Sequence, residues 1–524
     1  MKEDNIVTIP SRWMLAGSLV VSLCIGVLPF SLPIPFLLLE LLLTIFALFL
    51  FGSIRYRIDK NALTYGALLI IFVTFYPHAS IKTAIASNGF AAFMAHALPR
   101  LFSLSFLETI LHLDTMLFIF GLTFFVSVIA QTRMLEVISM QILHWTRGHL
   151  FKTVLIIITL VAIASGIMDG VSMIGLTIRV LVFILIMAKT PSEDVSYMTA
   201  VAVVVTCVCG IWLAYGEPPN LIMKSNLGLP DSFFLIYTLP MAIITLIIVA
   251  SFLYRRLNHR FIRMGELDLL EDKIADVRFY RALNGERIVE TKETLKTLLD
   301  RLGEDGLMTV EKQRTSAALW GKIAFLPFIA LLIGHAKNHA IPLFLSSMVA
   351  FLVALIGMLP HHQIKKDIFH DALEEYKEYL FLFPLFLSIA MLAEVGIFDV
   401  MKSGITQGVV VMGRANVAVI QFIGSAVLSA LLDNNVVADF ASRAIAGMGD
   451  MFLFAAAQIA GYATGGALTH IGSAQSVIAY AYILRHIDHR FTPFQWVKMM
   501  WKLIGTISLA LIGVLYLIAY FLNP

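Results

Sequence analysis

Two aspartates lie within apolar stretches of the sequence, where ionised carboxylates are rare. Asp169 and Asp433 each follow a serine by four residues in otherwise hydrophobic runs. Burying an ionised carboxylate in a bilayer is costly unless a cation, a basic partner or a cavity compensates, so both aspartates are predicted to be functional. Asn434 and Asn435 add neutral oxygens beside Asp433, and such oxygens suit a hard cation. We therefore expect Asp169 and Asp433 to bind Na⁺ or a proton.

A third carboxylate stands at a point where a helix must end. Glu217 follows Gly216 and precedes two prolines and Asn220. Proline lacks a backbone N–H and disfavours helical geometry in the residue before it, so Glu217 is predicted to lie at a chain break. The alternative position for this glutamate is a loop at the membrane surface.

A second polar stretch that disfavours a continuous helix extends from Thr464 to Ser473. Two glycines follow Thr464, and Thr469, His470 and Gly472 come before Ser473. Hydroxyl groups and freed backbone carbonyls can coordinate an ion. His470 could titrate near neutral pH, and a hydrogen-bonded structural role is its alternative.

Two arginines, Arg179 and Arg443, follow the two aspartates by ten residues each. They could form structural ion pairs with the aspartates, bind an anionic substrate, or extend toward the membrane interface. Ten residues cover about 15 Å along one helix, so a direct ion pair requires a break in the chain.

The positions of these residues indicate an internal duplication. An offset of 264 positions superimposes Asp169 on Asp433, and a serine and an arginine match at the same offset. An offset of 256 positions superimposes the break at Gly216 on the break at Gly472. Duplicated halves with interrupted helices at matching positions are typical of secondary transporters, whose substrates bind between broken helices near the bilayer midplane.

The elements that position these residues must be membrane helices. Hydrophobic residues make up 59% of the 524 residues, charged residues make up 14%, and the mean hydropathy is +0.86. Such a composition excludes a soluble domain. Because about 20 apolar residues cross a bilayer as one helix, the sequence predicts an all-α polytopic membrane protein with about 11–13 transmembrane helices.

The distribution of charge divides the chain. Residues 255–318 mix acidic and basic side chains densely, so we expect a solvated cytoplasmic insert there. Arg55, Arg57 and Lys60 follow the first two apolar runs, which predicts a cytoplasmic N-terminus. The predicted parts are an N-terminal transmembrane scaffold (1–110), a first transport repeat (111–254), the insert (255–318), connecting transmembrane helices (319–378) and a second transport repeat (379–524).

Over about residues 112–520 the sequence resembles the ion transporter superfamily of NhaD-type sodium/proton antiporters, ArsB-type arsenite permeases and citrate or dicarboxylate carriers. Asp433-Asn434 matches the Asp-Asn pair of that family, and Gly216 to Asn220 resembles the Gly-Asp-Pro-Pro-Asn motif of ArsB-like members, with Glu for Asp. The stretch from Thr464 to Ser473 resembles NhaD-type antiporters. Asp169-Gly170 departs from the family pattern, which usually has Asp-Asn. The resemblance implies inverted repeats, two re-entrant hairpins and a homodimer whose substrate-carrying part moves against a scaffold.

These observations favour a sodium/proton antiporter, in which Na⁺ (or Li⁺) and H⁺ compete for the same intramembrane carboxylates. The alternative is a Na⁺- or H⁺-coupled anion transporter of the dicarboxylate, citrate or arsenite type, in which Arg179, Arg443 and hairpin amides bind the substrate. The predicted ion-binding residues are Asp169, Ser172, Glu217, Asn220, Asp433, Asn434, Asn435, Thr464, Thr469, His470 and Ser473, with Arg179 and Arg443 as charge partners.

Other function classes have little support in the sequence. No nucleophile or catalytic metal motif is present, so an enzyme is not expected. The formal net charge of +3 is too small to indicate nucleic-acid binding. Cys24, Cys207 and Cys209 lie in apolar runs and are predicted to be small buried side chains. We expect a protein of the bacterial cytoplasmic (inner) membrane that has no cofactor beyond transported Na⁺ and H⁺, with lipid, small ions and a second copy as partners.

Overall fold

The computed structural model describes residues 7–8, 10–53, 56–57, 59–78, 103, 108, 112–168, 170–262, 273–284, 292–338, 340–377 and 379–521. Within these residues, eight helices are long and apolar enough to cross a membrane, or nine if one bent helix pair counts as a span. Five shorter apolar helices accompany them. The fold is therefore that of a polytopic helical membrane protein, as the composition predicts.

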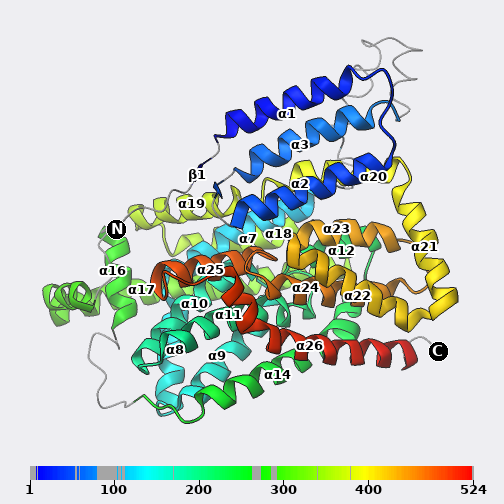
Figure 1. Cartoon of the computed structure of the whole chain (residues 1–524). Helices are drawn as coiled ribbons and strands as arrows, with labels where there is room; N and C mark the ends of the chain where they lie inside the picture. The colour runs from blue at the N-terminus through cyan, green and yellow to red at the C-terminus, as the bar shows by residue number, and fades with distance from the viewer. Residues whose placement is uncertain are drawn as a thin grey trace.

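Three N-terminal helices form a layer on one side of the molecule, at the top of Figure 1. The elements are β1 (Val7–Thr8), α1 (Ser11–Gly26), α2 (Pro35–Ser53), β2 (Tyr56–Arg57) and α3 (Lys60–Phe75). The two short strands pair in parallel. Asp59 fixes the start of α3, because its carboxylate accepts hydrogen bonds from the backbone N–H groups of Asn61 and Ala62. The helix α3 packs against α20 (Leu382–Glu394), and thus places Lys60 next to the second half of the chain.

The first half begins with a spanning helix and an amphipathic arm helix, α7 and α8. Its elements are α7 (Leu113–Gln131), α8 (Met134–Trp145), α9 (Leu150–Ser165), α10 (Gly170–Met187), α11 (Ser192–Cys207), η1 (Cys209–Trp212), α12 (Pro218–Leu227), α13 (Asp231–Phe233), η2 (Phe234–Thr238) and α14 (Leu239–Leu257). The helix α12 starts at Pro218, where a missing N–H costs nothing, and Gly228 ends it in the left-handed conformation (φ 62°).

The charged insert is helical and has a small apolar core of its own. The elements after the first half are α16 (Ile274–Asn284), α17 (Lys292–Lys337), α18 (Phe344–Ile356) and α19 (His362–Lys377). Side chains of α16 and α17 make the core, which contains Ile274, Val277, Leu295, Leu298, Leu299 and Leu307. The helix α17 bends at Gly303 (φ 64°) and continues across the expected boundary at residue 318. The insert and the next apolar segment therefore share one helix.

The insert is attached to the arm helix by ion pairs. Arg278 of α16 donates to Glu136 of α8 at 2.8 Å, and both side chains are largely buried. Within the insert, Arg314 donates to Asp276 at 2.7 Å. The insert thus packs against the membrane part rather than forming a free linker.

The second half repeats the order of the first. Its remaining elements are α21 (Ile397–Met412), α22 (Arg414–Leu431), α23 (Asn434–Ile445), α24 (Met451–Leu468), α25 (Ala474–His486) and α26 (Pro493–Phe521). A bend of 70° separates α20 from α21, at the position that α8 has after α7. The helices α14 and α26 follow the broken helices of each half and lie side by side (Figure 1).

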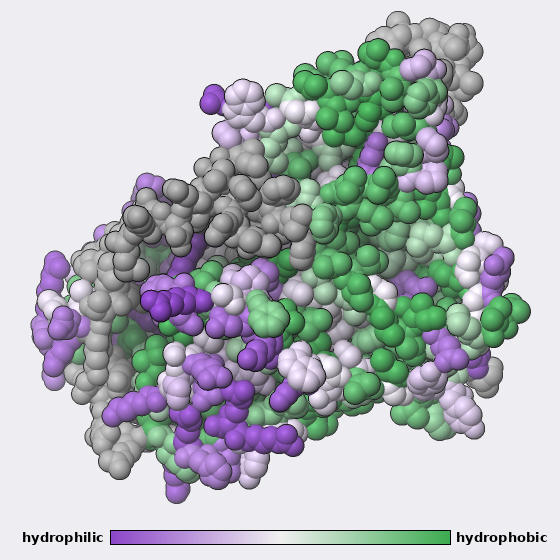
Figure 2. Space-filling model, viewed as in Figure 1, coloured by the Kyte–Doolittle hydropathy of each residue, from purple (hydrophilic) through white to green (hydrophobic). Residues whose placement is uncertain are grey.

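The surface separates polar ends from an apolar flank. Figure 2 shows hydrophobic residues over the N-terminal helices and the second half, and polar residues gathered at the end that carries the insert. Exposed apolar side chains include Leu19 and Leu23 of α1, Ile247 of α14 and Leu509 of α26. Such a flank is suited to lipid. Cys24 also lies on this exposed surface, so the prediction that it is buried is wrong, whereas Cys207 and Cys209 are buried.

Candidate functional site

Four helices begin at the chain breaks and bring their N-terminal ends together. The helices are α10, α12, α23 and α25, which start at Gly170, Pro218, Asn434 and Ala474. The backbone N–H of Gly170 donates to the carbonyl of Gly216 at 3.0 Å, which joins the first two breaks. Because a helix N-terminus carries unpaired N–H groups and a partial positive charge, this arrangement creates a region suited to negative charge.

Glu217 joins the break of the first half to that of the second. It is 2% exposed, and its two carboxylate oxygens accept hydrogen bonds from Gln475 Nε2 at 3.0 and 3.1 Å. The glutamate is therefore buried at the break, and the alternative of a surface loop is wrong. Gln475 belongs to the site but was not predicted, since a lone glutamine in a helix carries no signal in sequence.

The departure of Asp169-Gly170 from the family pattern has a structural explanation. A Cβ atom at Gly170 would lie 2.2 Å from Glu217 Oε1 and 2.6 Å from Gln475 Nε2. Glycine is required here because Glu217 fills the space that a side chain would need. Asp169 itself lies outside the described residues, and Ser172 is buried in the first turn of α10.

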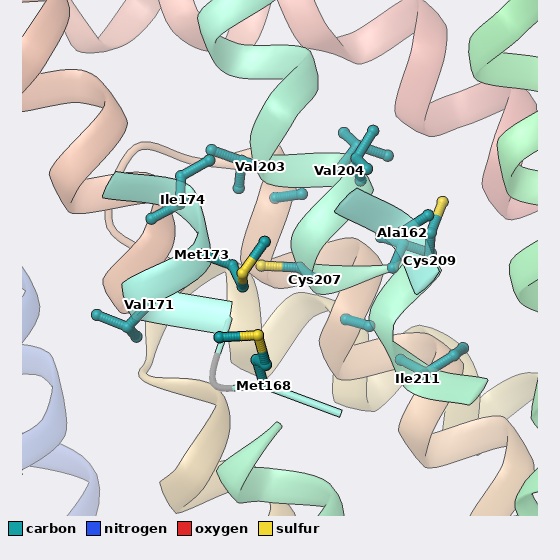
Figure 3. Packing of buried hydrophobic residues seen from close by; sticks show 14 of the residues in the cluster. Ala162, Met168, Val171, Met173, Ile174, Val203, Val204, Cys207, Cys209 and Ile211 are labelled. Atoms are coloured by element: carbon teal, nitrogen blue, oxygen red, sulfur yellow. The ribbon is translucent and has the colours of Figure 1, made fainter. Parts of the chain in front are cut away.

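The walls of the first break are apolar. Figure 3 shows Met173 of α10 and Cys207 of α11 pointing toward one another, with Met168 below them. Cys207 Sγ is 3.5 Å from Ser473 Oγ, so the two halves also meet here. A close packing of this kind excludes bulk water from the breaks.

Asn220 connects α12 to α24 through Tyr462, a residue that was not predicted from the sequence. Its Nδ2 donates to the carbonyl of Leu213 at 3.1 Å, and its Oδ1 accepts a short hydrogen bond from Tyr462. Tyr462 is 1% exposed. The prediction places Asn220 at the break correctly, but its role in this geometry is to tie the two halves together.

Asp433 caps α23 and is held by its neighbour. Its Oδ1 accepts hydrogen bonds from Asn435 N at 2.9 Å and from Asn435 Nδ2 at 2.7 Å. Asn435 Oδ1 is buried and has no hydrogen-bond partner within the described residues. Asn434 lies against Gly466. Asp433 and Asn435 therefore offer an anionic and a neutral oxygen at the N-terminal end of α23, and both are of the kind that suits Na⁺.

A small cavity of about 90 Å³ lies beside Asp433. Lys60 of α3, Asp433 and Ser473 provide its polar lining, and Phe381, Leu431 and other apolar side chains complete it. The Lys60 ammonium group interacts electrostatically with the Asp433 carboxylate. The N-terminal layer thus contributes a positively charged side chain to the second break, a role for Lys60 that was not predicted from the sequence.

The predicted polar stretch after Thr464 is only partly a break. The helix α24 continues through both glycines to Leu468, so the break is confined to residues 469–473. Thr464 donates to carbonyls of its own helix, those of Ala460 and Gly461. A Cβ atom at Gly465 would lie 2.1 Å from the carbonyl oxygen of Ala426, so this glycine permits close packing of α24 on α22.

The other residues of this stretch lie at the break. Thr469 donates to the carbonyl of Ala430 at 2.6 Å, and Ser473 accepts a hydrogen bond from the backbone N–H of Ser476 at 3.2 Å. His470 is buried, and its ring lies 4.6 Å from that of Tyr480 between centroids.

Equivalent glycines make the same close contact in both halves. A Cβ atom at Gly216 would lie 1.8 Å from the carbonyl oxygen of Ser165, and one at Gly472 would lie 2.7 Å from that of Ser429. These are the residues that the two sequence offsets superimpose. The duplication therefore appears in packing geometry as well as in sequence.

The two arginines lie away from the breaks. Arg443 Nε donates to Asp439 Oδ1 at 2.9 Å, so its partner is Asp439 rather than Asp433. One helical turn separates Arg443 from Asp439, whereas Asp433 is at the far end of the helix. Arg179 is exposed on α10 and interacts electrostatically with Asp371 of α19. Within the described ranges there is no group of three or more His, Cys, Asp or Glu side chains that could hold a metal ion.

Comparisons with known proteins identify relatives of this chain. A family profile described as citrate transporter, CitMHS, matches residues 48–333. An uncharacterized transporter of Mycobacterium tuberculosis is 23% identical over 360 residues, which cover 67% of this chain and 72% of the relative. A 46 kDa membrane protein of Mycobacterium leprae is 21% identical over 429 residues, covering 79% of this chain and 88% of the relative. Among solved structures, MtrF of Neisseria gonorrhoeae, from a class of antimetabolite efflux pumps, matches with a TM-score of 0.48 and 11% identity, covering 95% of this chain and 97% of that one.

Proposed function

Since the chain belongs to the CitMHS citrate transporter family, we propose that it is a secondary transporter that carries a citrate-type or dicarboxylate anion together with Na⁺ or H⁺. A sodium/proton antiporter is also a secondary transporter, so the two alternatives differ in the ions that they carry. The family match favours the anion alternative over the antiporter, and the site chemistry is consistent with that alternative.

The observation that carries the proposal is the meeting of four helix N-termini at the breaks. The helices α10, α12, α23 and α25 all start there, and hydrogen bonds join Gly170 to Gly216 and Glu217 to Gln475. Backbone N–H groups at helix N-termini bind carboxylates well, because the helix dipole favours negative charge and several donors lack a partner within the helix. Asp433 and Ser473 each cap one such N–H group, on α23 and α25. A substrate with several carboxylates can use more than one of these ends.

Lys60 supplies the side-chain charge that such a substrate needs. It lines the cavity of about 90 Å³ together with Asp433 and Ser473. This volume suits one carboxylate group rather than a whole tricarboxylate. We assign Lys60 the anchoring role expected from sequence for Arg179 and Arg443, because Arg443 is paired with Asp439 and Arg179 is exposed on α10.

The acidic residues of the site take the coupling cation in this proposal. Asp433 and the Oδ1 of Asn435, which has no hydrogen-bond partner among the described residues, are oxygen ligands of the kind that Na⁺ uses. Glu217 is a second buried carboxylate. A cation bound beside the anion offsets its charge in a region of low dielectric. Binding of the two ions is therefore mutually favourable, which is the requirement for coupled transport.

We further propose a homodimer in the bacterial cytoplasmic membrane, with the insert on the cytoplasmic side. The polar end of the molecule in Figure 2 carries the insert and agrees with this orientation. In this proposal, residues 1–110 form a scaffold, and connecting helices link the two transport repeats.

Transport assays in vesicles test the proposed function. Proteoliposomes containing the full chain would be given radiolabelled citrate or succinate under an imposed inward gradient of Na⁺ or of H⁺. We expect uptake of at least one of the two anions that depends on one of the gradients. Absence of anion uptake together with proton release on addition of Na⁺ would overturn the proposal in favour of antiport.

A variant separates the cation site from the anion site in the same assay. Asp433→Asn should abolish the dependence of uptake on the cation gradient, while Asp399→Asn on α21 serves as a matched control outside the breaks.

A further inference from the structure

A buried polar cluster lies away from the breaks, where α7, α12 and α23 meet. Asp439 of α23 is fully buried (0% exposed), and its Oδ1 accepts hydrogen bonds from Asn226 Nδ2 at 2.6 Å and Arg443 Nε at 2.9 Å. His112, which precedes α7, places its Nε2 atom 3.5 Å from the same oxygen. Asn226 also donates to Ser442 Oγ at 2.8 Å. The cluster thus joins helices from both halves.

The hydrogen bonding of this cluster is incomplete. Four of its buried atoms have no hydrogen-bond partner in the part of the chain that the structure describes: His112 Nδ1, His112 Nε2, Asp439 Oδ2 and Arg443 Nη2. A half-satisfied buried network is less stable than an apolar core, so its persistence points to a use. His112 also has a left-handed backbone (φ 49°), which non-glycine residues adopt rarely.

Among the described residues, Arg443 and His112 are the basic side chains that act on Asp439. Arg443, on the same helix, balances the carboxylate of Asp439. From the other elements, α12 contributes the neutral Asn226, and α20 contributes the ring of Phe386, which meets the His112 ring edge-on at 5.0 Å. His112 is the remaining titratable group that faces Asp439 among the described residues. Histidine ordinarily exchanges a proton near neutral pH.

We propose that His112 and Asp439 form a proton-binding site, distinct from the helix breaks, whose protonation strengthens anion binding at those breaks. A proton on His112 adds a positive charge to a cluster that is otherwise neutral, and the 3.5 Å approach to Asp439 becomes an ion pair. This inference rests on the proposed anion transport and adds to it the residues that bind the proton.

The helix α23 carries the effect from the cluster to the break. Six residues separate Asp439 from Asp433, which is about 9 Å along the helix axis. Asp433 lines the cavity in which Lys60 anchors the anion, so a charge in the cluster acts on the bound anion over about the same distance. At this distance, and with an effective dielectric constant of about 20, one unit charge changes the affinity for another by about 20-fold. By linkage, the anion strengthens proton binding by the same factor.

Calorimetry of citrate binding to the full chain in detergent tests the proposal. Titrations in buffers of different ionisation enthalpy give the number of protons taken up per citrate bound, and the difference between variants cancels the protons of citrate itself. A roughly 20-fold coupling limits the proton uptake on binding to about 0.6 proton per citrate. We therefore expect His112→Gln to take up about half a proton fewer than the wild type near neutral pH and to lose most of the roughly 20-fold pH dependence of affinity. His489→Gln, at an exposed histidine, should behave as the wild type does.

The outcomes separate this inference from the proposed function. Citrate binding with unchanged proton uptake in His112→Gln would overturn the inference alone. Absence of binding of both citrate and succinate to the wild type would overturn the proposed function and the inference with it. If His112→Gln does not fold, His112→Asn provides the same comparison with a smaller side chain.

Discussion

At the scale of single residues, the site combines opposite charges that serve different ions. Glu217 is buried and held by Gln475, whereas Lys60 comes from the N-terminal layer and faces Asp433 across a small cavity. In the proposed mechanism the carboxylates attract the cation and the ammonium group attracts the anion. Removing the charge of Glu217 should therefore impair coupling to the cation, and removing that of Lys60 should impair binding of the anion.

Neutralising Glu217 should affect the coupled step. Glu217→Gln keeps the size of the side chain but removes the charge, so we expect cation-driven anion uptake in proteoliposomes to fall by about 10-fold or more. Glu193→Gln, at an exposed glutamate of α11, is the control and should leave uptake unchanged. Uptake by Glu217→Gln at the wild-type rate would remove this residue from the cation site.

Neutralising Lys60 should affect substrate binding. Loss of one positive charge at the cavity should raise the KM for the anion by about 10-fold with a smaller change in kcat. Lys498→Gln replaces an exposed lysine of α26 and should leave KM as it is. If KM were the same in Lys60→Gln as in the wild type, another group would have to anchor the carboxylate.

At the scale of elements, close backbone contacts decide how the broken helices meet. Gly216 lies against the carbonyl of Ser165, and Gly472 lies against that of Ser429. A hydrogen atom in place of a side chain lets each broken helix approach its neighbouring hairpin. By contrast, no atom of the described part of the chain lies within 4 Å of a Cβ atom placed at Gly505 in α26.

The loss of stability caused by a glycine-to-alanine substitution should therefore depend on the space available to the added Cβ atom. We expect Gly216→Ala to destabilise the protein by about 3 kcal/mol or more and Gly472→Ala by less, because its Cβ atom would have more room. Gly505→Ala should be neutral or stabilising by about 0.5–1 kcal/mol, since alanine favours a helix. Thermal unfolding in detergent measures the stabilities of the three variants. Equal losses of stability in Gly216→Ala and Gly505→Ala would contradict the expected order.

The contact between the insert and the connecting helices should depend on pH. Phe279 of α16 meets the His361 ring edge-on at 5.8 Å, and burial lowers the pKa of His361. The docked state therefore holds fewer protons than the undocked state just below the ordinary pKa of histidine, about 6.5, and acidification favours undocking. Hydrogen exchange of α16 should become faster between about pH 7 and pH 5.5.

A variant isolates the contribution of this histidine. His361→Asn removes the titration, so exchange of α16 should then depend much less on pH in the same range. An equally strong pH response in the variant would assign the effect to other groups of the insert.

At the scale of the whole molecule, the two halves are joined at the breaks. Glu217 contacts Gln475, Asn220 contacts Tyr462, and Cys207 Sγ lies 3.5 Å from Ser473 Oγ. These bonds favour a unit in which both breaks move together against the remaining helices, as the family resemblance implies.

A disulfide across the halves tests this unit. Ser473→Cys places a second thiol beside Cys207, and oxidation should link them. If the breaks move together, oxidised and reduced proteoliposomes of this variant should transport at rates within about twofold of one another. Ser473→Cys with Cys207→Ala is the control that cannot form the bond. Loss of transport on oxidation, restored by reduction, would instead require the halves to separate during each cycle.

Much of this arrangement could be predicted from sequence because bilayers penalise polar groups and breaks. The carboxylates at Glu217 and Asp433, the prolines after Glu217 and the offsets of the duplication were all visible for that reason. Gln475 and Tyr462 were missed because their types are common in helices and their partners lie more than 200 residues away. The glycines after Thr464 were misinterpreted, because a glycine in a helix permits close packing as well as a break.

The two breaks carry different residues at equivalent positions, and this difference affects the direction of transport. Glu217 in the first half matches Ser473 in the second, and Gly170 matches Asn434. A carrier made of two equivalent halves would face either side of the membrane with equal energy. This chain has its buried glutamate in one half and an asparagine pair in the other, so its two end states differ in energy. The empty carrier should therefore prefer to face one side of the membrane. Its rates of import and export should be unequal under equal driving force.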